Sequence, residues 1–257
     1  MDYVEYKGKQ YYLVDNRLDL SNLGIHKISD IVGLENLTKL KELDFSNNGI
    51  VEIEGLETLI HLEVLNLRVN QIKEVKGLDA LTNLKHLYIY NNQLAEIKGL
   101  DSLINLVELN LFDNRIQRIQ GLEKLINLER LYLGSNRIKE IRGLEELKHL
   151  KFVNIEKNFI TELKGFNSLD NLVLLAIKRN AIKEIMGLEH LKQLKRLELA
   201  FNEITEIKGL AELNYLEIID LRGNPVYEKE LQLATKKIKV KLLDAKELVL
   251  YCQSHKI

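Results

Sequence analysis

The fold is decided by a short unit whose complete form is LNLRVNQIKEVKGL, residues 65–78. The same pattern of leucine, asparagine and glycine returns every 22 residues. The glycine recurs nine times without a slip, at Gly33, Gly55, Gly77, Gly99, Gly121, Gly143, Gly165, Gly187 and Gly209. The asparagine also recurs nine times, at Asn48, Asn70, Asn92, Asn114, Asn136, Asn158, Asn180, Asn202 and Asn224. A fixed period held over so many units predicts stacked repeats that share one continuous core.

Each position of the unit has a physical reason. Leu65 and Leu67 alternate with other residues, as in a short strand whose leucines point to one side. The amide of Asn70 both donates and accepts hydrogen bonds, so stacked asparagines can satisfy backbone groups at a sharp bend. Gly77 allows a bend or a close backbone approach that a Cβ would obstruct. One coil cannot bury its apolar face alone, and so neighbouring coils bury it for each other.

This pattern resembles the leucine-rich repeat, in its 22-residue class, over residues 21–224. The class includes the type-1 protein phosphatase regulatory subunit, the spliceosomal A-prime protein and the bacterial internalins. The resemblance implies an α/β-type solenoid, a horseshoe with a concave parallel β-sheet and a convex side of 3₁₀ and irregular segments.

We expect a single structural domain in three parts. Residues 1–20 are predicted to form an N-terminal hairpin cap, and residues 21–224 nine coils. The first coil is atypical, because Ser21 stands in a leucine position and His26 in the asparagine position. Residues 225–257 are predicted to form a helical C-terminal cap.

The two cap sequences contain their own signals. Residues 3–6 and 10–14 read as two strands of the hairpin, and residues 18–20 as a third extended stretch. Pro225 fits the first turn of a helix that we expect to end near Lys237, followed by an extended stretch to Leu242.

The last helix should start at residues 244–247, which have capping-box spacing. The start at Pro225 resembles the C-terminal cap of the phosphatase subunits, and the N-terminus shows none of the signal-peptide character expected of internalins. We therefore favour the phosphatase-subunit branch of the class.

Side chains that flank the strand leucines should form the concave surface, where the sequence varies most. Five aromatic residues fall on four successive coils, at Tyr88, Tyr90, Phe112, Tyr132 and Phe152. Five such rings bury at most about 750–1,250 Å², and one side of a standard interface is about 800 Å². We therefore predict that these rings anchor a partner protein. The alternative is that they stack along the sheet and bind nothing.

Charged residues on the same surface should orient the partner. The predicted steering residues are Arg130, Lys178, Arg179 and Arg196. Acids lie toward the N-terminal half, at Glu42, Asp44, Glu108 and Asp113. On the convex side, the coils instead repeat glutamate and lysine at fixed positions, a pattern that is typical of a solvated surface.

Other kinds of site find little support in the sequence. The six histidines show no metal-ligand spacing, the glycines form no phosphate-binding loop, and Glu108 with Asp113 has no accompanying nucleophile. The basic run Lys236, Lys237, Lys239 and Lys241 is interpreted as a solvated edge. We therefore expect no catalytic residue, no metal and no cofactor, and do not expect an enzyme.

Composition and charge narrow the classes of partner that the sequence predicts. The chain has 257 residues, with 37 basic and 38 acidic side chains, so its net charge gives no reason to expect a nucleic acid or a membrane as the main partner. The longest apolar run is residues 172–177, too short to span a bilayer. The single cysteine, Cys252, fits a reducing compartment, cytoplasmic or, in a eukaryote, nuclear.

The sequence therefore favours a monomeric, non-enzymatic scaffold for protein–protein interaction, with a phosphatase-regulator-like adaptor as a narrower hypothesis. An RNA or ribonucleoprotein binding module is the first alternative, and a structural or adhesive surface protein is the second.

Overall fold

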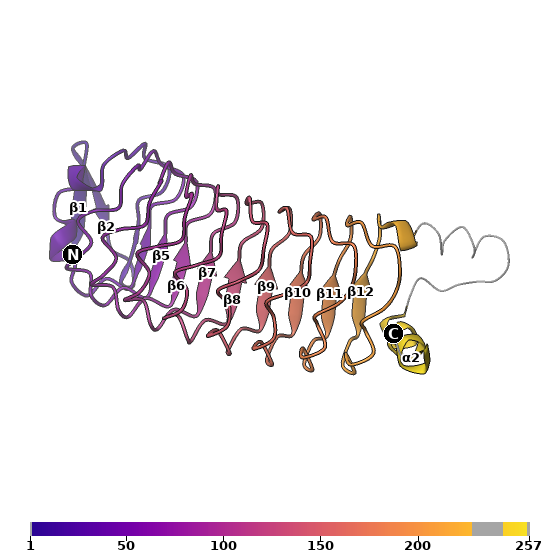
Figure 1. Cartoon of the computed structure of the whole chain (residues 1–257). Helices are drawn as coiled ribbons and strands as arrows, with labels where there is room; N and C mark the ends of the chain where they lie inside the picture. The colour runs from indigo at the N-terminus through magenta and orange to yellow at the C-terminus, as the bar shows by residue number, and fades with distance from the viewer. Residues whose placement is uncertain (1, 228–243, 256–257) are drawn as a thin grey trace.

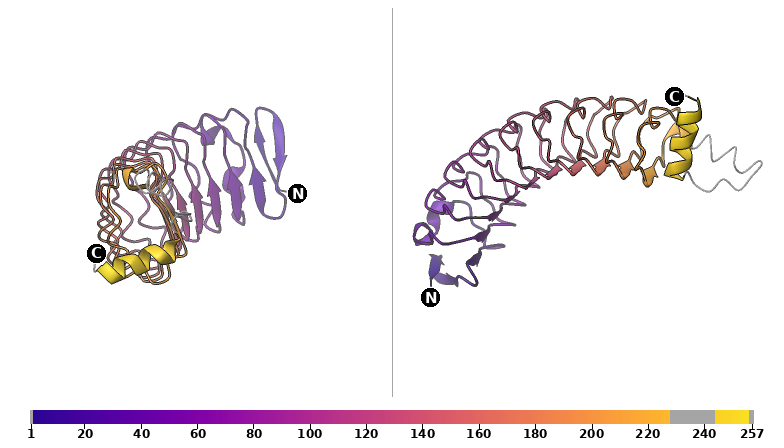
Figure 2. Two further views of the ribbon diagram at one scale, coloured as in Figure 1. Left: turned by 90° about the vertical axis from the view of Figure 1, so that its right-hand side faces the viewer. Right: turned by 90° about the horizontal axis from the view of Figure 1, so that it is seen from below.

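Short parallel strands, one from each coil, lie side by side in a curved sheet. The computed structural model describes residues 2–227 and 244–255. In this described part the main sheet has ten strands, in unbroken chain order from β3 to β12. They are β3 (Arg17–Asp19), β4 (Glu42–Asp44), β5 (Val64–Asn66), β6 (His86–Tyr88), β7 (Glu108–Asn110), β8 (Arg130–Tyr132), β9 (Phe152–Asn154), β10 (Leu174–Ala176), β11 (Arg196–Glu198) and β12 (Ile218–Asp220). Figure 1 shows the stacked coils, and Figure 2 shows that the strands line the inner side of the arc. The predicted leucine-rich-repeat horseshoe is confirmed.

Each strand has only three residues, because its role is to turn one side chain into the core. Leu43, Leu65 and Leu87 are the central residues of β4, β5 and β6, they pair in register, and all three are buried. The residues on either side of each central leucine point away from the core. The concave face is therefore built from the strand positions that the core does not use.

The asparagine ladder predicted from the period holds the coils together. Asn70 Nδ2 donates to the carbonyl oxygens of Leu67 in its own coil (3.1 Å) and Phe45 in the preceding coil (3.0 Å). Its Oδ1 accepts the backbone N–H of Ile50 at 2.9 Å. The same bonds recur at the later asparagines of the ladder. Each amide thus satisfies buried backbone groups that strand pairing leaves open.

Most of the convex glycines are required by close backbone approach. Gly121 has φ +69°, and a Cβ built there would lie 2.6 Å from the carbonyl oxygen of Ile97 in the preceding coil. This confirms the reason inferred for the glycine position. Gly55 has nearly the same φ, +68°, but nothing lies within 4 Å of its Cβ position.

The register of the first coil was wrong in the sequence analysis. Leu18, rather than Ser21, pairs with Leu43, so this coil spans 25 residues from strand to strand instead of 22. The same register puts Leu23, rather than His26, in the asparagine position. The extra residues include the 3₁₀ turn η1 (Ile28–Asp30) and bring Val32 to the N-terminal edge.

That insertion is where the N-terminal hairpin attaches. β1 (Tyr3–Tyr6) pairs antiparallel with β2 (Lys9–Tyr12). Glu5 and Val32 exchange backbone hydrogen bonds of 2.9 Å each, which joins β1 to the first coil. The predicted second strand reached residue 14, whereas β2 ends at Tyr12. The third extended stretch, β3, belongs to the main sheet rather than to the hairpin.

The other end of the array is closed by α2 (Ala245–His255), which Figure 2 shows lying beside the last coils. Asp244 Oδ1 accepts the backbone N–H of Lys246 at 2.8 Å and so caps the helix. Cys252 is buried, and burial raises the pKa of its thiol, which fits a packing role. Gln253 Nε2 donates to the Ala211 carbonyl oxygen at 2.8 Å.

Residues 225–227 are helical, as the Pro225 signal predicts. The predicted remainder of that helix, the extended stretch to Leu242 and the basic run at 236–241 lie outside the described residues. Within residues 2–227 and 244–255, no helix has the length and hydropathy needed to cross a bilayer.

Candidate functional site

The concave face gathers the five predicted aromatic anchors near the middle of the sheet. Tyr88 and Tyr132 are the last residues of β6 and β8, and Phe152 is the first residue of β9. Tyr90 and Phe112 each lie two residues beyond the end of a strand. All five side chains are partly exposed, and none lies in the packed core.

Contacts between neighbouring coils hold several of these rings in place. The rings of Tyr132 and Phe152 lie 4.8 Å apart between centroids, at 39°. The ring of Phe112 covers Gly134 on the next coil, where a Cβ would lie 2.7 Å from its Cε2 atom. The Tyr90 hydroxyl accepts a hydrogen bond of 2.9 Å from Arg68 Nη1. The five rings therefore lie on adjacent coils as partly exposed side chains of the concave face.

Glu108 lies among the rings, in the middle of β6–β7–β8. Strand pairing puts His86 on one side of it and Arg130 on the other. Burial raises the pKa of the Tyr88 hydroxyl, and the nearby Glu108 carboxylate raises it further. The Tyr132 hydroxyl has its pKa raised for the same two reasons.

The predicted steering cations are largely paired within the molecule. Lys178 Nζ lies 2.7 Å from Glu198 Oε2, and Arg196 Nη2 lies 2.5 Å from Glu198 Oε1. Arg130 Nη1 lies at a longer 3.8 Å from Glu108 Oε2. Arg179 packs over the ring of Phe201 at 5.0 Å from its centroid. Among the described residues, Arg179 is thus the one predicted steering residue without an acidic partner within 4.0 Å.

Some residues of the concave face have structural roles that the sequence analysis missed. The side-chain oxygens of Asn66, Asn110 and Asn154 accept the backbone N–H two residues later, at 3.2, 3.0 and 2.9 Å. These bonds shape the bend at the end of the strand, as asparagine and aspartate commonly do. The signal was present in the sequence, because asparagine or aspartate recurs at this position of the coil.

Eight residues that lie three positions further along their coils are held in the left-handed conformation, with φ between 52° and 58°. They are Asn47, Val69, Asn91, Asp113, Ser135, Lys157, Arg179 and Phe201. Asparagine, found here at Asn47 and Asn91, tolerates this region, whereas β-branched and bulky residues are strained in it. Val69 and Phe201 are also exposed. Their strained, exposed placement adds two apolar side chains to the rim of the concave face.

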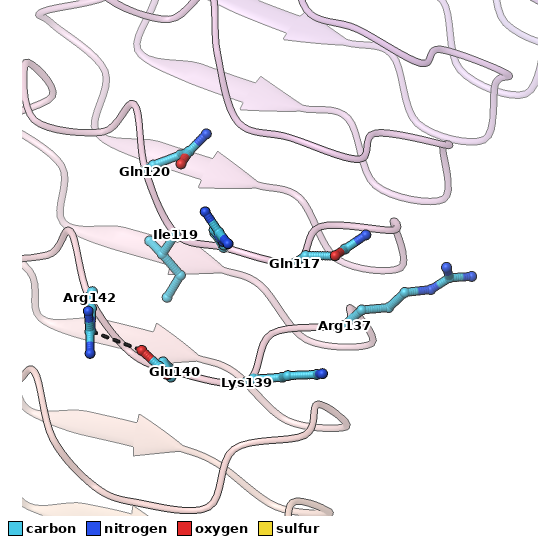
Figure 3. Close-up of a pocket in the computed structure, with 8 residues that line it drawn as sticks. Gln117, Ile119, Gln120, Arg137, Lys139, Glu140 and Arg142 are labelled. Atoms are coloured by element: carbon cyan, nitrogen blue, oxygen red, sulfur yellow. Dashed lines mark ion pairs between the residues drawn. The ribbon is translucent and has the colours of Figure 1, made fainter.

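A basic patch outside the concave face was also missed. Arg118, Arg137, Lys139 and Arg142 line a shallow cavity of about 590 Å³ on two neighbouring coils. Figure 3 shows Arg137 and Lys139 extending away from the ribbon, while Arg142 pairs with Glu140 at 2.9 Å. The sequence signal is Arg118, which stands where seven other coils have glutamate.

Metal and acid–base chemistry find no additional support here. In residues 2–227 and 244–255, no group of three or more His, Cys, Asp or Glu side chains is arranged to hold a metal ion. Glu108 and Asp113 lie on the same coil, but Asp113 is exposed and no pair contact joins them in the described structure. The arrangement is suited to binding across a surface.

Comparison with known proteins agrees with this architecture. The family model described as "Leucine Rich repeats (2 copies)" matches residues 60–102 and 104–149, and that described as "Leucine Rich repeat" matches residues 36–60. No curated protein matches the sequence.

Several solved structures are similar. Internalin C2 of Listeria monocytogenes is 31% identical, with a TM-score of 0.69, and the match covers 77% of this chain and 88% of the internalin. A leucine-rich-repeat protein of Leptospira interrogans is 29% identical with a TM-score of 0.71, over 79% of this chain and 60% of that one.

A third similar structure was solved together with another molecule. It is the ectodomain of the plant receptor kinase GASSHO1/SCHENGEN3 from Arabidopsis thaliana, in complex with CASPARIAN STRIP INTEGRITY FACTOR 2. Identity is 26% and the TM-score 0.62, over 81% of this chain but only 27% of the ectodomain chain.

Proposed function

Because this chain belongs to the leucine-rich-repeat family, whose arrays commonly act as protein–protein interaction scaffolds, we propose that it is a non-enzymatic scaffold with a protein partner on its concave sheet. The observation that carries the proposal is the gathering of Tyr88, Tyr90, Phe112, Tyr132 and Phe152 on adjacent coils of that face. A large exposed apolar patch is unusual on a protein without a partner, and tyrosine is enriched at binding hot spots.

The charged residues of the concave face have two different roles in this proposal. Lys178 and Arg196 share the single carboxylate of Glu198, so they form an ordered group in which only one of the two positive charges is compensated. Arg179, which lacks an acidic partner among the described residues, remains available to steer an approaching acidic group. The aromatic cluster supplies most of the affinity, and the charged residues orient the partner.

The sequence alone supports three narrower statements, to which the comparisons add nothing. The first is a role as a phosphatase-regulator-like adaptor. The second is a reducing location, cytoplasmic or nuclear, for which the solitary Cys252 is the argument. The third is a monomeric state.

The test is a double substitution, Tyr88→Ala with Phe112→Ala. The partner is first identified by affinity capture from the source cell and mass spectrometry, and its binding to purified variants is then measured by calorimetry. We expect the affinity to fall by about 30-fold or more, as for the loss of a hot spot.

The matched control is Ile104→Ala with Ile126→Ala, two exposed apolar residues on neighbouring convex turns. It should bind as the original chain does. Equal binding by both double variants, with unchanged unfolding curves, would contradict the proposal.

The basic patch favours a second candidate function, RNA binding. Arg118, Arg137 and Lys139 have no ion-pair partner in the described part of the chain, so they can contact phosphate groups. Binding to a mixed RNA pool should then weaken steeply with salt, and should be lost on Arg137→Ala with Lys139→Ala. No binding at low salt would end this candidate.

A further inference from the structure

The side chain of Glu108 is largely buried, and its carboxylate is only loosely paired within the molecule. Only 16% of its side chain is exposed. The nearest nitrogen atoms of basic side chains are His86 Nδ1 at 3.6 Å and Arg130 Nη1 at 3.8 Å, both beyond hydrogen-bond distance. Within the described residues, no group donates a hydrogen bond to this carboxylate.

Glu198, on the same concave face, shows the opposite arrangement. Its side chain is 10% exposed and receives Lys178 Nζ at 2.7 Å and Arg196 Nε at 2.5 Å. A carboxylate withdrawn from water is costly unless donors replace the lost water. Glu198 has those donors in its own chain. Glu108 lacks them, although its burial is similar.

His86 adds a second unsatisfied group at the same point. Its Nδ1 atom is buried and has no hydrogen-bond partner in the described structure. The imidazole stacks on Tyr88, with 6.4 Å between centroids and 13° between planes. The ring is therefore held beside Glu108 without completing its hydrogen bonding.

Two tyrosines lie near the carboxylate, one on each neighbouring strand, where both pair in register with Asn110. Tyr88 and Tyr132 come from the strands on either side of Glu108, and both have raised pKa values through burial and through this carboxylate. A cation between such rings gains from their negative faces, and more so when water is excluded. A carboxylate near the rings can add a charge-assisted hydrogen bond.

We propose that Glu108 is the anchor for a basic side chain, arginine or lysine, of the protein partner, which enters between Tyr88 and Tyr132. This inference rests on the proposed scaffold function and names the chemistry that the partner brings to it. An arginine matches the site best, because its planar fork can bind the carboxylate with two hydrogen bonds and stack on a tyrosine. A phosphate-rich partner is disfavoured at this point by the charge of Glu108.

The probe is a library of phage-displayed random peptides, selected on the full chain. We expect the selected peptides to share an arginine or lysine. A synthetic selected peptide should bind about 30-fold or more weakly to Glu108→Gln, which keeps the shape of the side chain and removes its charge. Replacing the shared basic residue of the peptide with glutamine should cost a similar factor, and the two changes together should cost little more than either alone.

Asp113→Asn is the matched control, because it removes an exposed acid from the same coil. It should leave peptide binding unchanged. Selected peptides without a shared basic residue, or equal binding to Glu108→Gln and the original chain, would overturn the inference.

The double variant Tyr88→Ala with Phe112→Ala separates this inference from the function on which it rests. If the peptide is lost on that variant but retained on Glu108→Gln, only the role of Glu108 fails. If the peptide binds the aromatic double variant unchanged, the concave scaffold function fails as well.

Discussion

The ring of Phe112 lies over Gly134 of the next coil, so close that a Cβ at Gly134 would stand 2.7 Å from Phe112 Cε2 and 2.8 Å from Cδ2. Gly134 does not need a left-handed backbone, so its lack of a side chain leaves room for the Phe112 ring and for the Asn154 Oδ1 atom, which would lie 2.9 Å from the same Cβ. The two residues together set the position of one predicted partner anchor.

Gly134→Ala should therefore displace the Phe112 ring while leaving the array folded. Overpacking usually lowers the free energy of unfolding by about 1–3 kcal/mol. We expect a smaller loss here, because a ring on the exposed face can move aside. Binding of the identified partner should weaken. The check is a double-mutant cycle with Phe112→Ala: once the ring is gone, Gly134→Ala should have no further effect on binding. Independent, additive effects would show that the glycine does not position the ring.

Gly121→Ala should be more destabilising than Gly55→Ala, although both glycines have almost the same positive φ. Each alanine pays about 1–2 kcal/mol for the left-handed backbone. Only at Gly121 does the new Cβ also meet a carbonyl oxygen, that of Ile97, at 2.6 Å. The difference between the two should be at least about 1 kcal/mol, a typical cost of overpacking. Urea unfolding of both variants measures it, and equal midpoints would refute the steric argument.

Glu198 should make the free energy of unfolding depend on pH in the acid range. Burial raises the pKa of its carboxyl, but the hydrogen bonds from Lys178 and Arg196 outweigh burial and leave it below the usual 4.5. A lowered folded-state pKa stabilises the fold above pH 4.5, and this stabilisation is lost as the pH falls through the lowered pKa. In Glu198→Gln, unfolding free energy should fall less steeply below pH 4.5.

A second variant reverses the sign of that dependence. In Lys178→Met with Arg196→Met, burial of Glu198 is no longer opposed, so its pKa should rise above 4.5. This variant should then gain stability, relative to the original chain, as the pH falls through the raised pKa. Thermal unfolding between pH 3 and 7 compares the variants, and parallel pH profiles for all of them would count against this network.

Much of the fold was predictable because every coil presents the same local problem. The period of Asn70 and its equivalents fixes the ladder, and the glycine period fixes the close approach of neighbouring turns. The prediction failed at the first coil, where three extra residues moved Leu18 into the position assigned to Ser21. A period cannot locate an insertion in the one unit that lacks its asparagine.

The candidate site was predictable only in part, for a related reason. The sequence by itself determined which side chains emerge on the concave face, because a strand alternates its side chains and the period repeats that alternation through every coil. Tertiary structure alone decided which of these groups satisfy each other. Glu198 receives Lys178 from the preceding coil and Arg196 from its own strand, whereas Glu108 receives no hydrogen bond within the described chain, because hydrogen bonding depends on how far each side chain reaches and not on the period.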